Sequence, residues 1–252
     1  MDKNVLICAA GLGLASLIGS GIGALVKHIP HKLNDVFLGF CAGMMLAASL
    51  VCLIMPSIEM LPLSQCWQSL CGVALGVLLI ALLDHVTPHL HRLSGLDIEK
   101  HPNTSTTNRV FLFVLAIAMH KFPEGLATGV AFDGGDMSNA YSLSIAIALQ
   151  NIPEGMVVVT PLIMIGVSAF RVLNISLLVA LLEVLGVCVG YWIGDLSEIF
   201  LPSMLGLAGG AMLYVISDEM IPETHAHGYE KPATYALIAG VMLMLLIEKL
   251  SI

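Results

Sequence analysis

Two related hexapeptides contain the residues best suited to chemistry in this chain. The first is His-Lys-Phe-Pro-Glu-Gly at 120–125, and the second, Gln-Asn-Ile-Pro-Glu-Gly, begins 30 residues later. Both lie within long apolar stretches, where a proline and an ionisable residue each destabilise a membrane helix. Positions i and i+4 share a helix face, so His120 lies beside Glu124 and Gln150 beside Glu154. Imidazole and carboxylate are ligands for zinc and similar metals, so the repeat predicts a site for a divalent metal ion.

The proline and glycine of each copy fit this interpretation. Pro123 and Pro153 each remove a backbone N–H and free a carbonyl oxygen, which is tolerated in a membrane helix that lines a cavity. Gly125 and Gly155 allow neighbouring helices to approach closely. Glu183 is a third acid inside an apolar stretch and is expected to share the site. The structural alternatives are a kink with an interhelical hydrogen bond and, for Glu183, a neutral side chain bonded to a neighbour.

The composition is that of an integral membrane protein. The chain has 252 residues, of which 58% are hydrophobic and 11% charged, and its mean hydropathy is +0.93. Its apolar runs are far longer than the roughly ten residues of a barrel strand, which predicts an all-α membrane protein. The absence of a P-loop signature argues against ATP-driven transport by this chain alone. No cofactor and no nucleic-acid partner are expected.

Windows of about 20 apolar residues predict about eight transmembrane helices in a single membrane domain, 1–252. The longest polar connection, Arg92–Thr107, separates three spans from a hairpin and a second group of three, a 3+2+3 arrangement. The predicted spans cover 4–27, 34–57, 67–90, 108–132, 138–162, 168–194, 200–223 and 232–250.

Two features predict how these spans are oriented. Ala42-Gly43 precedes Pro56 by the same interval as Ala208-Gly209 precedes Pro222, in spans that run in opposite directions. Inverted repeats of this kind are common in secondary transporters, whose substrate site lies near the bilayer midplane. Both termini are expected outside the cell, because seven basic residues then face the cytoplasm and two face outward. The seven are Lys27, Lys32, Arg92, Lys100, Arg109, Arg171 and Lys231, and the two are Lys3 and Lys249.

The paired hexapeptides, with Glu183 in the next span and the 3+2+3 layout, resemble the ZIP family of zinc- and iron-regulated metal transporters. The resemblance covers nearly the whole chain, includes the segment from Ala208 to Glu223, and is strongest to the bacterial GufA-like and ZupT-like branch. It implies a binuclear site between spans four, five and six, and a bundle of spans one, four, five and six that slides against the others. The first metal would be held by four motif residues: His120, Glu124, Gln150 and Glu154.

The resemblance places a second metal at positions 121, 151 and 183, bridged by the two motif glutamates, and two of these positions depart from the family. Position 121 is commonly Asn there and is Lys here, and position 151, Asn151 here, can be Asp. Protonated Lys121 cannot bind a metal, so we interpret it as a cation that substitutes for the second ion among Glu124, Glu154 and Glu183. The alternatives are that Lys121 packs elsewhere or loses its proton.

The sequence thus predicts a secondary transporter in the cell membrane that moves divalent cations toward the cytoplasm. Zinc is the first expectation, and iron, manganese and cobalt accept the same ligands. Asp84, His85 and His89 at the cytoplasmic end of span three are expected to form an exit relay or, alternatively, a polar helix terminus. An intramembrane metalloenzyme and a transport-inactive metal sensor are the alternative functions, and no H-E-x-x-H motif supports the enzyme. The lipid bilayer is the expected surrounding, and a homodimer is left open.

Overall fold

The computed structural model describes residues 2–26, 29–86, 121–133, 136–164, 166–194 and 199–251. These residues are overwhelmingly helical, and no strand occurs among them. The helices follow from the apolar runs, because a segment in lipid has no water to bond its peptide groups and must bond them internally.

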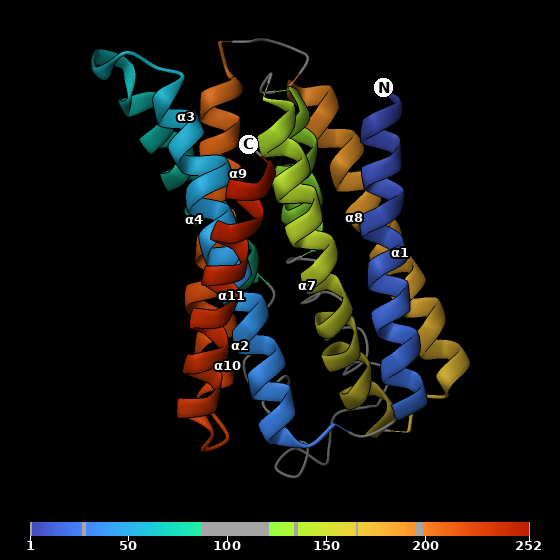
Figure 1. Cartoon of the computed structure of the whole chain (residues 1–252). Helices are drawn as coiled ribbons and strands as arrows, with labels where there is room; N and C mark the ends of the chain where they lie inside the picture. Colours follow the sequence, from blue (N-terminus) through green and yellow to red (C-terminus); the bar gives the residue numbers. More distant parts are fainter. Residues whose placement is uncertain are drawn as a thin grey trace.

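The long helices run nearly parallel or antiparallel through the molecule (Figure 1). Seven of those in the described residues are long and apolar enough to cross a membrane. Residues 121–133, also helical, correspond to the end of the fourth predicted span, 108–132, whose earlier residues lie outside the described part of the chain. The predicted all-α membrane fold is therefore confirmed. The long helices and their bounds are α1 (Lys3–Val26), α2 (His31–Ala48), α4 (Trp67–Val86), α7 (Met137–Met164), α8 (Ala169–Gly194), α9 (Leu201–Val215) and α11 (Glu230–Ser251).

The helices form two groups. One consists of α1, segment 121–133, α7 and α8, and we call it the site bundle. In it α1 packs against α7 and α8, and segment 121–133 lies against α8. The other consists of α2, α4, α9 and α11, and we call it the wall group. In it α4 packs on α9 and α11 on α2. Helix α7 joins the two groups, because it also contacts α2 and α11.

The helices that contain Pro56 and Pro222 each widen into a π-helical turn just before the proline. The turn η1 (Ser49–Ile54) is followed by α3 (Met55–Glu59), and η4 (Ile216–Met220) is followed by α10 (Ile221–Thr224). A π turn accommodates the missing proline N–H and is often found at functional sites. The two equivalent irregularities agree with the inverted repeat predicted from the sequence. A short 3₁₀ turn, η2 (Leu63–Gln65), leads into α4.

Outward-facing side chains of both groups are apolar. Leu78 on α4, Leu178 on α8 and Met242 on α11 are each more than 60% exposed. Such a surface would be unfavourable in water and is suited to contact with lipid chains. The buried interior of the site bundle, in contrast, contains polar residues that could contact an ion, which are Glu124, Gln150, Asn151, Glu154 and Glu183.

Candidate metal site

The candidate site is centred on Lys121, at the start of the described part of segment 121–133. Its side-chain nitrogen donates to Glu124 Oε2 at 2.6 Å, to Glu154 Oε2 at 2.7 Å and to Asn151 Oδ1 at 2.5 Å. Glu124 is one helical turn away, whereas Asn151 and Glu154 come from α7. The Lys121 ammonium therefore links the two hexapeptides, because the glutamates of both copies accept hydrogen bonds from it.

A second set of bonds extends this cluster to α8 and α1. Asn151 Nδ2 donates to Glu183 Oε1 at 2.7 Å, and Ser16 Oγ donates to Glu183 Oε2 at 2.9 Å. Asn151 thus connects Lys121 to Glu183 through the two ends of its amide. All four helices of the site bundle contribute a side chain to one continuous network.

Gln150 lies on the other side of Glu124. Its Nε2 donates to Glu124 Oε1 at 3.3 Å, and its backbone oxygen accepts from Cys41 Sγ on α2 at 3.4 Å. Gln150 Oε1 is buried and has no hydrogen-bond partner within the described residues. A buried amide oxygen without a partner is unfavourable unless a ligand satisfies it. The Gln150 amide lies next to Glu124 Oε1, whereas Lys121 bonds the other oxygen of that carboxylate, Oε2. A cation that binds oxygen ligands would therefore suit this side of the glutamates.

Charge and burial set the chemistry of the cluster. Lys121, Glu124, Glu154 and Glu183 are at most 4% exposed. One ammonium offsets one of the three carboxylates if all three are ionised, so two negative charges remain. Uncompensated buried charge is strongly unfavourable, and a divalent cation would complete the balance. A carboxylate and amide oxygen set of this kind accepts zinc as well as harder divalent ions.

Close backbone contacts bring the charged helices together. A Cβ at Gly125 would overlap the carbonyl oxygen of Glu183, and a Cβ at Gly155 would lie 2.8 Å from the carbonyl oxygen of Ser16. The glycines that follow the two glutamates therefore allow segment 121–133 to reach α8 and allow α7 to reach α1. This confirms the close approach expected from the sequence and explains why both copies of the motif end in glycine.

Some predicted site residues are not placed by the structure. His120 and His89 lie outside the described residues. Asp84 and His85 belong to the last turn of α4, but their side chains are outside the described part. Within the described ranges, no three His, Cys, Asp or Glu side chains gather closely enough to hold a metal ion. The candidate ligand set therefore depends on amide oxygens and on His120 as well as on the glutamates.

Ser16 is a site residue that the sequence reasoning missed. It lies on α1, which the motifs do not mark, and contacts Glu183 from a position 167 residues earlier in the chain. A signal was present, because Ser16 and Ser20 are four residues apart on an otherwise apolar helix and so share one face.

Comparison with known proteins supports the family expectation. A family model described as the ZIP zinc transporter matches residues 96–248. The zinc transporter ZIPB of Bordetella bronchiseptica is 40% identical over 94% of this chain and 79% of its own length. The zinc transporter GufA of Myxococcus xanthus is 38% identical over 95% of this chain and 98% of its own length. The zinc transporter ZupT of Streptococcus mutans is 31% identical over 96% and 95% of the two chains.

A bundle of apolar helices that encloses a charged cluster is the arrangement of a multi-pass membrane transporter. With the matches above, the chain belongs to the ZIP family of zinc transporters. The resemblance inferred from the hexapeptides is confirmed. The relatives are named as transporters, so the chain is a transporter rather than an enzyme.

Proposed function

We propose that this protein moves zinc or a similar divalent cation toward the cytoplasm through a midplane site in the site bundle. The ligands are His120, Glu124, Gln150 and Glu154. The observation that carries the proposal is the meeting of Glu124 and Glu154, one from each copy of the motif, at a single buried cation. Two carboxylates that already share one cation at lipid depth are suited to binding another.

The ion is expected on the side of the glutamates that faces Gln150. Lys121 uses Oε2 of both glutamates, and Gln150 contacts Glu124 Oε1. Rotation of the Gln150 amide would turn its unpartnered Oε1 toward an ion there. Lys121, which Asn151 links to Glu183, then supplies positive charge in place of a second cation. We therefore propose one transported ion per chain.

The direction of transport rests on the distribution of charge along the sequence. The predicted outer loops contain five acids and no basic residue, which raises the local concentration of cations at the mouth. These acids are Glu59, Asp133, Asp136, Asp195 and Glu198. Asp84, His85 and His89 would receive the ion on the cytoplasmic side. Both termini are then extracytoplasmic, and cysteines introduced between Arg92 and Thr107 should be labelled only in permeabilised cells.

The decisive experiment is uptake of radiolabelled zinc, iron, manganese and cobalt into liposomes that contain the purified protein. Zinc should accumulate faster than in protein-free liposomes, and unlabelled zinc should compete with the other metals. Zinc binding without flux would favour the transport-inactive sensor. Proteolysis of a membrane substrate without metal uptake would favour the intramembrane enzyme.

A further inference from the structure

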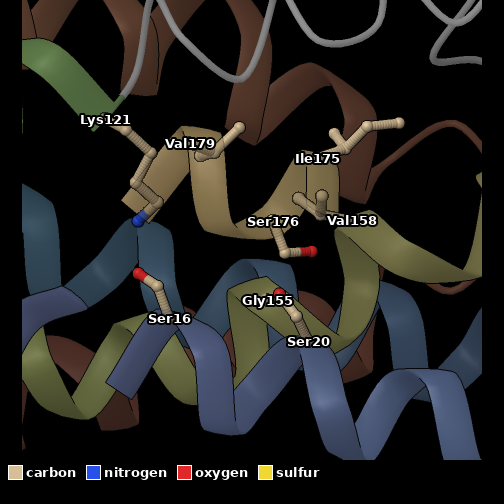
Figure 2. A pocket seen from close by; sticks show the side chains of 8 residues that line it. All are labelled: Ser16, Ser20, Lys121, Gly155, Val158, Ile175, Ser176 and Val179. Atoms are coloured by element: carbon tan, nitrogen blue, oxygen red, sulfur yellow. The ribbon is translucent and has the colours of Figure 1, made fainter. Parts of the chain in front are cut away.

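A small cavity lies beside Lys121, between α1, α7 and α8 (Figure 2). The space open to the centre of a water-sized sphere is about 20 Å³, which accommodates about one water molecule. An ammonium group is close to water in size. Besides Lys121, the residues that line the cavity include three serines, Ser16, Ser20 and Ser176, together with Gly155 and Val158.

The cavity extends from the charged cluster toward one end of the site bundle. Ser20 is one turn beyond Ser16 on α1, and Val158 is one turn beyond Glu154 on α7. Ser176 is seven residues before Glu183 on α8, an axial distance of about 10 Å. On each of these helices the cavity residue is displaced toward the same end of the site bundle. At this end α1 finishes at Val26, α7 finishes at Met164 and α8 begins at Ala169. The cavity therefore extends from Lys121 toward this end of the bundle, and Ser16, which lines it, also bonds Glu183.

The hydroxyl groups in the cavity can accept hydrogen bonds. Ser176 Oγ donates to the backbone oxygen of Val172 at 3.1 Å, so its lone pairs stay available. Within the part of the chain that the structure describes, the Ser20 hydroxyl has no partner. Figure 2 shows Ser16 and Ser20 directed from α1 toward Lys121 and Ser176. Three hydroxyl acceptors in a space of ammonium size form a second environment that Lys121 can reach.

A divalent ion at Glu124 and Glu154 changes the balance of forces on Lys121. The ion competes with the ammonium for the negative charge of the two carboxylates. In addition, the ion and the ammonium repel one another when they lie a few ångströms apart. Lys121 has a flexible four-carbon stem, so its head group can shift while its backbone stays fixed. A shift away from the ion leads into the cavity.

We infer that the serine-lined cavity is the position to which the Lys121 ammonium shifts when a divalent ion binds. The inference rests on the proposed function, because it assumes that Glu124 and Glu154 bind the transported ion. The ammonium keeps its proton and exchanges part of its bonding to the glutamates for bonds to Ser20 and Ser176. It returns to the glutamates when the ion leaves and again offsets part of their negative charge. Ser20 and Ser176 are thus positioning residues for Lys121 rather than ligands.

Filling the cavity tests this inference. Ser176→Val removes the hydroxyl, adds a methyl group and should weaken zinc binding about tenfold in calorimetric titration of the purified protein. In a Lys121→Met background the same change should alter zinc affinity by less than about twofold, because no ammonium then needs the space. Ser144→Val is the matched control, since Ser144 is also buried and donates to a backbone oxygen one turn back, away from the cavity.

An equal loss of affinity in both backgrounds, or no loss in either, would overturn the inference. If Ser176→Val does not fold, Ser176→Ala cannot clash and should still weaken zinc binding about threefold only when Lys121 is present. The proposed function fails separately, through Glu154→Ala binding zinc as tightly as the unchanged protein.

Discussion

The site bundle and the wall group both consist of long apolar helices, but they differ in the residues that are buried inside them. Lys121, Glu124, Glu154 and Glu183 are buried in the site bundle. In the described helices of the wall group and in the π turn η1 that continues α2, buried polar residues are mainly hydroxyls that bond nearby groups, such as Ser49 with the Leu46 carbonyl oxygen. Asp35, at the beginning of α2, accepts from His227 at 3.0 Å. Among the described residues, buried ionisable side chains are therefore concentrated in the site bundle rather than in the wall group.

This difference suggests a division of roles. The site bundle holds the ion ligands as one unit, linked by side-chain bonds among all four of its helices. The wall group faces it with small and apolar residues of α2, such as Cys41, Ala42 and Met45. The side-chain bonds between the bodies are few among the described residues, and include Cys41 to Gln150 and Asn139 to the Cys52 carbonyl oxygen. A charged unit against an apolar wall is suited to the sliding motion that the family resemblance implies.

The largest expected effect is on the charged cluster. Glu154→Ala should abolish zinc uptake and weaken zinc binding by about 100-fold or more, which corresponds to about 3 kcal/mol. The protein should still insert, because Lys121 remains paired with Glu124. Glu154→Gln, which preserves shape, should show the same loss of uptake in liposomes.

Glu230→Ala is the matched control for this change, because Glu230 is an exposed acid at the start of α11 in the wall group. It should leave uptake unchanged. Near-normal flux in a well-folded Glu154→Ala protein would remove the distinction between the two bodies.

The next effect is on the packing of the site bundle. Gly125→Ala would place a methyl group against the Glu183 carbonyl oxygen and should destabilise the protein by about 1–3 kcal/mol. Thermal unfolding in detergent measures the change, and zinc uptake should fall because Glu183 is displaced. In Gly21→Ala, where no atom lies within 4 Å of the new Cβ, neither quantity should fall. Equal stability of the two variants would show that segment 121–133 does not depend on this contact.

The smallest effect is expected where α3 meets the wall-group helix α4. The hydroxyls of Ser57 and Ser69 bond each other within the buried interior. Ser57→Ala leaves Ser69 without this partner and should lower the free energy of unfolding by about 1 kcal/mol. The zinc concentration for half-maximal uptake should stay the same, because the pair supports packing only. A shift in that concentration would show that ion binding also depends on the wall group.

Much of the fold could be predicted from the sequence, because the bilayer requires long apolar helices with internally bonded backbones. The predicted span 168–194 and α8, Ala169–Gly194, differ by one residue. The π turns η1 and η4 could not be predicted, since prolines such as Pro56 indicate an irregularity without its form. In the site, helical spacing predicted which residues share a face. The spacing of Ser16 and Ser20 marks a polar face on α1, but it could not predict that Ser16 contacts Glu183, because contacts between distant helices leave no local pattern.

In the proposed site, one transported ion binds between the motif glutamates while Lys121 takes the place of a second. Anomalous scattering from zinc-soaked crystals locates the ion directly. One strong peak is expected beside Glu124, Gln150 and Glu154, and two peaks are expected in Lys121→Asn, where an amide oxygen replaces the ammonium. Two strong peaks at the glutamates of the unchanged protein, with Lys121 turned away, would show that Lys121 does not replace an ion, and a single peak remote from both glutamates would show that they do not bind it.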